Sequence, residues 1–280
     1  MRISPLAIAQ PPHFSAHFAN TSAHGLRLKN PAQDQLWHDT EFFSPSSFFH
    51  QLLEQLKQLP PGTPIYSMAC STGEEPLSLA MILVSQFGRE AASKYKITAV
   101  DIGKQAIEQA KSGVVTVNHT ERRNADAALA GSSTGDNTLM SFLEPLTRRD
   151  YRPALRPRIN NVTSETLQLQ PWFANLVSQM VTFSVGDVRQ VLSNNPIDSS
   201  KPCVFLFRNA WHYLPDKDRT TLLQQLKQQM APGSIIGIGH LEHERSGEYA
   251  TRERVSTAEL IERAGFTPMS KKNATLFQKK

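Results

Sequence analysis

The stretch from Pro64 to Met81, PIYSMACSTGEEPLSLAM, most constrains how this chain can fold. It opens with a short apolar run, breaks at Ser71-Thr72-Gly73, and restarts with two acids and a proline. Gly73 can adopt the backbone of a sharp turn, and Pro76 suits a first helical turn, where its missing N–H costs nothing. The order predicts a strand, a tight loop and a helix N-terminus. Such a loop can place backbone N–H groups and a carboxylate around a ligand.

The rest of the chain continues this alternation of strands and helices. Ser46 or Ser47 can cap a helix that precedes the loop stretch, and one face of that helix is formed by the apolar positions Phe48, Phe49, Leu52, Leu53 and Leu56. The pattern predicts an α/β fold, a doubly wound and mostly parallel sheet whose last strands form an antiparallel C-terminal edge. Helices are predicted from Pro76 to about Phe87, from Gln105 to Lys111, from Asp216 to Met230, and over the segment TAELIERAGF. Strands are predicted to end before Ser71, at Asp101, before Asp187 and before Asn209, and two more are predicted over SIIGIGH and ATLFQ.

Residues 113 to about 178 interrupt the alternation, and we expect an insertion in a domain that spans residues 35–280. Part of it is small and polar, which is typical of a surface excursion. Five arginines lie between Arg148 and Arg158, with Tyr151 among them. We favour a solvated loop for this cluster, and the alternative is a docking surface for an acidic partner. Residues 1–34 are polar and weakly periodic, as in a loosely ordered segment or a non-classical secretion signal.

Composition narrows the class of protein. The 280 residues are 39% hydrophobic and carry a net charge of +5, which gives no argument for nucleic-acid binding. Cys70 and Cys203 lie far apart and fit buried thiols in a reducing compartment, with no metal-ligand spacing. We find no ordinary signal peptide and no apolar stretch of membrane-spanning length. We therefore expect a monomeric cytoplasmic protein without membrane insertion.

Polar side chains follow four of the predicted strands, at the edge where ligands bind in such sheets. An acid at Asp101 would accept both hydroxyls of a ribose. Asp187, or a neighbouring backbone amide, could bond an adenine edge. The loop lacks the GxGxxG of dinucleotide sites and the lysine of phosphate loops, and its carboxylates would repel a pyrophosphate. They suit a positively charged ligand with an amino group, and S-adenosylmethionine has both features.

Five motifs carry a family resemblance. The segment ACSTGEEPLSLAM resembles the signature loop of the chemotaxis-receptor (CheR-type) methyltransferases, and TEFFS resembles that family's TxFFR. AVDIGKQAIEQAKSG is similar to its ribose-binding segment, FLFRNAWHYLPD to its RNVxIYFD, and APGSIIGIGHLE to its closing PGGxLxxGHSE. The resemblance covers roughly residues 38–243 and implies a class I methyltransferase fold of the Rossmann-like type.

The resemblance also implies a function and a site. The family uses S-adenosylmethionine to methylate glutamate side chains, so a protein substrate is expected. Tyr213 would face the transferred methyl group as the catalytic residue. The cofactor would be lined by Thr40, Glu75, Asp101, the pair Asp187–Val188 and the pair Asn209–Ala210, without a metal.

The chain departs from the family pattern at several places. Ser44 stands where the family has an arginine, and Arg208 or the Arg148–Arg158 cluster could replace it. We expect neither the family's N-terminal helical domain, since few residues precede Thr40, nor its inserted β-subdomain. A methyltransferase for another protein site or a small molecule, and an inactive cofactor-binding module, therefore remain alternatives. The strand-end residues also have structural alternatives: helix caps at Asp101 and Asp187, a turn at Asn209, and a core aromatic at Tyr213.

Overall fold

The computed structural model describes residues 40–146, 164–243, 255–270 and 274–280. The predicted 1–34 segment and the Arg148–Arg158 cluster lie outside the described residues. Within the described ranges, no helix is both long enough and apolar enough to span a bilayer.

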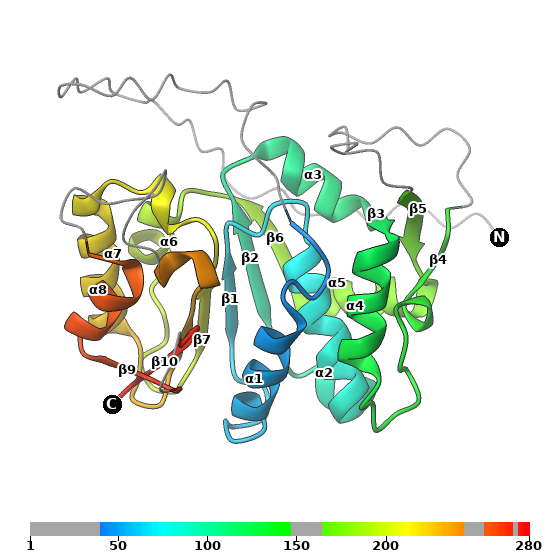
Figure 1. Cartoon of the computed structure of the whole chain (residues 1–280), viewed down its shortest axis with the longest axis horizontal. Coiled ribbons are helices and arrows are strands. Elements are labelled where there is room, and N and C mark those ends of the chain that lie inside the picture. The colour runs from blue at the N-terminus through cyan, green and yellow to red at the C-terminus, as the bar shows by residue number, and fades with distance from the viewer. Residues whose placement is uncertain (1–39, 147–163, 244–254, 271–273) are drawn as a thin grey trace. The chain divides into compact units, whose positions relative to one another are not determined.

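A seven-stranded sheet forms the centre of the described fold, in the order β6-β2-β1-β7-β8-β10-β9 (Figure 1). The first five strands of that order are parallel, and β10 runs antiparallel to both β8 and β9. The predicted doubly wound, mostly parallel sheet with an antiparallel C-terminal edge is confirmed. The strands are β1 (Ile65–Met68), β2 (Ile97–Asp101), β6 (Val181–Val185), β7 (Val204–Phe207), β8 (Ile235–Gly237), β9 (Phe266–Pro268) and β10 (Leu276–Lys279).

Alternate residues of the central strands supply two hydrophobic cores, one on each face of the sheet. In β1, Ile65 belongs to one core and Met68 to the other. The first core includes side chains of α1 (Ser46–Leu56), α2 (Glu74–Ala92), α4 (His119–Leu129) and α5 (Pro171–Met180). The second includes side chains of α6 (Val188–Asn194), α7 (Asp216–Gln229) and α8 (Thr257–Arg263). Helices on both faces bury a parallel sheet, as its near-continuous apolar strands require.

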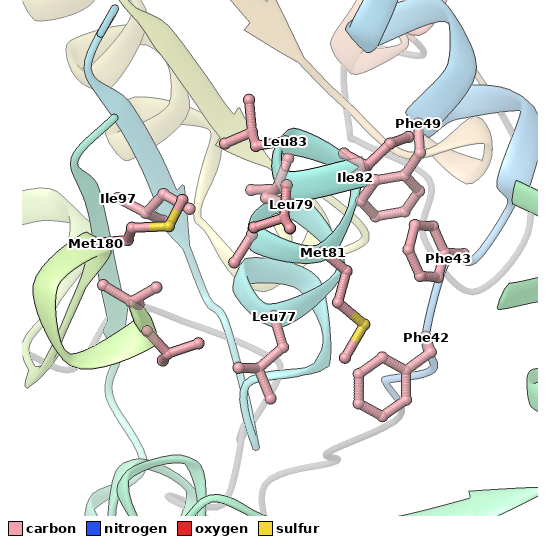
Figure 2. Close-up of a cluster of buried hydrophobic side chains, with 14 of the residues drawn as sticks. Phe42, Phe43, Phe49, Leu77, Leu79, Met81, Ile82, Leu83, Ile97 and Met180 are labelled. Carbon is pink, nitrogen blue, oxygen red and sulfur yellow. The ribbon is translucent and has the colours of Figure 1, made fainter. Parts of the chain in front are cut away.

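Helix α2 carries the run AMILV, which is too apolar for a helix with one exposed side. Figure 2 shows the reason: α2 lies between Ile97 and Met180 on one side and Phe42, Phe43 and Phe49 on the other. The helix is interrupted at Gly88, whose φ of 78° is not helical, one residue beyond the predicted end at Phe87. The loop before α2 therefore precedes a helix whose residues 76–85 are all buried.

The predicted absence of an inserted β-subdomain is wrong. Between α3 (Lys104–Ser112) and α5, the chain forms a three-stranded antiparallel sheet in the order β3-β5-β4. Its strands are β3 (Val114–Asn118), β4 (Leu143–Pro145) and β5 (Ser164–Leu169), and α4 and the short helix η2 (Leu139–Ser141) lie between them in the sequence. The polar stretch that favoured a surface excursion covers only the second half of α4 and the turn after it.

The start of α1 also differs from the prediction. Its N-cap is Pro45, without a side-chain capping bond, instead of Ser46 or Ser47. The five predicted apolar positions of α1 are nevertheless buried: Phe48, Phe49, Leu52, Leu53 and Leu56. Burial of this face, and not a capping hydroxyl, therefore fixes the helix.

Candidate functional site

The loop after β1 has a tightly constrained backbone. Ala69 and Ser71 have positive φ angles of 57° and 49°, which are unfavourable for residues with a Cβ. Gly73 has φ 100°, and a Cβ there would lie 3.0 Å from Cβ of Ala110. Backbone bonds hold the turn, from Cys70 N to Val100 O and from Gly73 N to Cys70 O, both 3.0 Å. Such strain persists only where surrounding contacts enforce it, and it clusters at functional loops.

Asp101 ties this loop to the end of β2. Its Oδ2 accepts the N–H of Ser71 at 2.8 Å, and its Oδ1 accepts the N–H of Gly103 at 2.7 Å. The residue is 7% exposed. A carboxylate offers about four acceptor positions, so two bonds leave capacity for ligand hydroxyls. Asp101 therefore has a structural role, because its carboxylate accepts backbone N–H groups of the two loops. Its ribose-binding role remains a prediction.

Glu75 lies in a buried ion pair with Arg208. Its Oε2 is 2.9 Å from Nη1 of Arg208, and its Oε1 accepts the Ser67 hydroxyl at 2.7 Å. Arg208 also donates to the carbonyl of Ser44, and its guanidinium lies 4.0 Å above the ring of Phe48. The charged groups of Glu75 and Arg208 are therefore both engaged in contacts within the protein. The geometry does not support Arg208 as a replacement for the family arginine at Ser44.

Thr40 reaches the loop through Glu74, the neighbouring acid. The Thr72 hydroxyl donates to Glu74 Oε2 at 2.7 Å, and the Thr40 side chain also hydrogen-bonds this carboxyl group. Burial raises the pKa of Glu74 to about 7, although both hydroxyls oppose that rise. Ser78 Oγ donates to the Glu74 carbonyl and accepts the N–H of Phe43, which links α2 to the segment after Thr40.

The end of β6 lies beside Asp101, since Val185 is its partner in the parallel register. Asp187 caps α6 by accepting the N–H of Arg189 at 2.9 Å, and it forms an ion pair with the Arg189 guanidinium. Arg189 Nη1 also lies 3.3 Å from Asp218 on α7. The Asp187 side chain is therefore in use as a cap. The adenine contact expected from Asp187 or a neighbouring backbone amide stays a prediction.

A sharp turn follows β7 and carries the remaining predicted residues. Asn209 is exposed and has φ 55°, and the N–H of Tyr213 donates to the Ala210 carbonyl at 3.1 Å. The turn ends in the short helix η3 (Trp211–Tyr213). Tyr213 is 56% exposed, so its interpretation as a core aromatic is wrong. Burial and the charge of Arg219 lower the pKa of His212 to about 4.

Predicted residues thus follow or end four parallel strands: Glu75 comes after β1, Asp101 ends β2, the pair Asp187–Val188 follows β6 and the pair Asn209–Ala210 follows β7. Direct contacts join the loop to Asp101, and the register joins Asp101 to Val185. The backbone N–H of Tyr213 bonds the carbonyl of Ala210, and the catalytic role of the Tyr213 side chain stays a prediction. Within the described ranges, no cluster of His, Cys, Asp or Glu could hold a metal ion.

Two buried charges lie at this edge: Arg208, which the sequence suggested only as a replacement for the family arginine, and Glu242, which it did not single out. Arg208 directly follows an all-apolar strand, and a charge at that position requires a buried partner. Glu242, in the short helix η4 (His240–His243), accepts the N–H of Ala210 at 3.1 Å. Its position in the segment GHLE, directly after the apolar run IIGI, was the available signal.

Comparison with known proteins supports the resemblance in the first half of the chain. Residues 34–130 match the family model described as the CheR methyltransferase, SAM binding domain. The chemotaxis protein methyltransferase of Escherichia coli K12 is 35% identical over 85 residues, which is 30% of this chain and 29% of that protein. The Klebsiella aerogenes protein of the same name is 37% identical over 75 residues, 27% of this chain and 26% of that protein.

These matches therefore extend over less than a third of the curated relatives. Among solved structures, a SAM-dependent methyltransferase from Aquifex aeolicus aligns with 89% of this chain and 95% of its own. The TM-score of this alignment is 0.45 and the sequence identity is 12%. The predicted resemblance to the CheR-type methyltransferases is confirmed over residues 34–130, which include Thr40, Glu75 and Asp101.

Proposed function

We propose that this protein is an S-adenosylmethionine-dependent O-methyltransferase that methylates a carboxylate, namely a glutamate side chain of a protein. The observation that carries the proposal is the match of residues 34–130 to the SAM-binding domain of the CheR methyltransferases. That segment contributes the strained loop after β1 and the buried acid Asp101. Both lie at the carboxyl edge of the parallel strands, where α/β sheets bind ligands.

The residues at this edge fit the cofactor, with one change in their assignment. Asp101 keeps acceptor capacity for ligand hydroxyls, and Val188 is the first residue of α6. The Asn209–Ala210 turn follows β7, which pairs with β1. Glu75 would act indirectly, because Arg208 already neutralises it. When bound, S-adenosylmethionine supplies an electrophilic methyl group on a positively charged sulfur. Tyr213, exposed on the same turn, would contact the reacting groups.

Methyl transfer to a carboxylate requires little from the protein beyond the positioning of the two reactants. A glutamate carboxylate is ionised at neutral pH, so it is a nucleophile without a general base. We therefore assign no general-base role to His212. Its pKa is lowered to about 4, so it is neutral at pH 7, and the centroid of its ring lies 4.0 Å from that of Tyr213. The site residues would hold the reactants in line and exclude water, which can supply several kcal/mol of barrier reduction, roughly 7 or more in favourable cases.

A cofactor-binding module without transferase activity is the second candidate. Ser44 stands where the family has an arginine, and Arg208 donates to the Ser44 carbonyl while paired with Glu75. An acceptor carboxylate would then meet less positive charge in this chain than in the family.

Two measurements test the proposal in sequence. Calorimetry with S-adenosylhomocysteine should show binding, and undetectable affinity would reject cofactor binding altogether. If it binds, transfer of labelled methyl groups to proteins of a cell lysate should give base-labile esters. Base-stable label would indicate a different acceptor, and binding without any transfer would favour the module. Tyr213→Phe is the matched variant, because it keeps the ring and removes only the hydroxyl.

The partner and the compartment are parts of the same proposal. We propose a protein substrate, docked by the arginines of the Arg148–Arg158 cluster if that cluster binds acidic partners. Cys70 and Cys203 are buried and form no disulfide, which supports a reducing compartment such as the cytoplasm. Crosslinking of Arg148→Glu/Arg149→Glu variants to the labelled substrate should weaken if the cluster docks it.

A further inference from the structure

Glu242 is a buried acid with no assigned role, and it lies behind the turn that carries Asn209 and Tyr213. The residue is 5% exposed. Its Oε1 accepts the N–H of Ala210 at 3.1 Å, so it connects η4, after β8, to the turn after β7. The backbone N–H groups of Gly239 and Trp211 also act on this carboxyl group. The Glu242 carboxyl group thus interacts with backbone N–H groups of two chain segments, the turn after β7 and the residues after β8.

The space around Gly239 shows that Glu242 also adjoins Asn209. A Cβ at Gly239 would lie 1.8 Å from Asn209 Oδ1 and 2.6 Å from Glu242 Oε2. Both oxygens therefore converge on the space that only a glycine leaves open. Among the described residues, Glu242 Oε2 has no hydrogen-bond partner of its own. A proton on Glu242 Oε2 would make it a hydrogen-bond donor on the side where Asn209 Oδ1 lies.

We propose that Glu242 is a positioning residue of the candidate cofactor site, which holds the Asn209–Tyr213 turn and orients the Asn209 side chain. The proposal rests on the proposed function only for the role of this turn. Asn209 has a positive φ of 55°, so its conformation needs enforcement from outside the turn. The bond from Ala210 to Glu242 provides that enforcement at the next residue.

The charges around Glu242 allow its protonation to be followed. Burial raises the pKa of Glu242 to about 7, and Arg208 at the end of β7 opposes that rise. Arg219 faces it from α7, and the pKa of the nearby His212 is lowered to about 4. On α8, which packs against η4, Glu259 accepts the N–H of its own cap residue, Ser256. Glu242 should therefore be the group here that titrates near neutral pH.

The first experiment needs no cofactor. In a variant that keeps Trp211 as its single tryptophan, the emission should change in a step near pH 7, because Trp211 adjoins the titrating acid. Glu242→Gln should remove that step and keep the fold, since its amide can both accept from Ala210 and donate to Asn209. The absence of a step in the Glu242 protein, or its persistence in Glu242→Gln, would overturn the proposal.

The second experiment measures affinity for S-adenosylhomocysteine by calorimetry. Glu242→Leu should weaken binding by about tenfold or more, and Glu242→Gln should restore it to within about threefold. Glu259→Gln is the control, because it also removes a carboxylate that accepts a backbone N–H, but on α8. Equal affinity in Glu242→Leu and the unmodified protein would overturn the positioning role. If Glu242→Leu does not fold, the Glu242→Gln titration decides. Failure of the unmodified protein to bind would reject the proposed function and leave the emission test intact.

Discussion

Asp101 serves the fold and the candidate site with the same two oxygens. Asp101→Ala would leave the N–H groups of Ser71 and Gly103 unpaired, so the free energy of unfolding should fall by about 2 kcal/mol. Asp101→Asn keeps one acceptor and should cost less. In both variants, calorimetry should show at least about tenfold weaker binding of S-adenosylhomocysteine.

The matched control for Asp101 is Asp198. Its carboxylate also accepts the N–H of the residue two positions on, Ser200, at 3.0 Å, but on the exposed surface. Asp198→Asn should leave cofactor affinity unchanged. If Asp101→Asn binds as tightly as the unmodified protein, Asp101 is a structural residue only.

Arg208 and Glu75 form a second residue-scale unit, and removing either partner should be costly. Arg208→Met leaves the Glu75 carboxylate buried and unpaired, so the free energy of unfolding in urea should fall by about 3 kcal/mol. Arg208→Lys should not rescue it, because one ammonium cannot reach both Glu75 and the Ser44 carbonyl. The double variant Arg208→Met/Glu75→Leu should cost clearly less than the two single variants combined. Additive losses would argue against the pair.

The residues of the site differ in how far the sequence could reveal them. Asp101, Asp187 and Asn209 each follow an apolar strand, so their place at one sheet edge was predictable from strand order alone. Their bonds were not, because the Asp187–Arg189 pair and the Ser71 contact depend on how the loops fold. Glu242 was harder still. Its partner Ala210 lies 32 residues away, and no local pattern encodes that contact.

At the scale of elements, the seven-stranded sheet was predictable and the small sheet was not. The strands of the large sheet are apolar runs bounded by turns, a pattern that needs no knowledge of their partners. Strand β4 has three residues, and the first half of β5, Ser164–Thr166, is exposed and polar. These strands are stabilised by antiparallel pairing, of β5 with β3 and of β4 with β5. Pairing between segments far apart in the chain cannot be predicted from the local sequence pattern.

The packing of α1 on β8 gives a prediction at the same scale. A Cβ at Gly237 would lie 2.5 Å from Leu206 Cδ2 and 3.0 Å from Phe48 Cζ, and both side chains are buried. Gly237→Ala should therefore lower the free energy of unfolding by about 1–3 kcal/mol in urea denaturation. Gly131→Ala is the control, since nothing lies within 4 Å of its added Cβ. An unchanged midpoint for Gly237→Ala would mean that α1 can shift away from the sheet.

For the molecule as a whole, buried acids should set the pH dependence of stability. Burial raises the pKa values of Glu74 and Glu242 to about 7 and also raises that of Glu121. The folded protein then holds these protons more tightly than the unfolded chain. Their stabilising contribution is complete below the unfolded pKa of about 4.5 and is lost as the pH rises through about 7. His212 acts in the opposite direction, because its lowered pKa makes stability fall as the pH drops from about 6.5 to about 4.

The two trends separate above about pH 6.5, where only the acids still titrate. The thermal midpoint should therefore fall as the pH rises from about 6.5 to about 8. Glu74→Gln keeps a donor and an acceptor beside Thr72 but cannot ionise, so its midpoint should fall less over that range. Glu108→Gln, at an exposed position on α3, should keep the slope of the unmodified protein. A slope that Glu74→Gln does not reduce would mean that Glu74 stays ionised in the folded protein, with its charge held by the hydroxyls of Thr72 and Thr40.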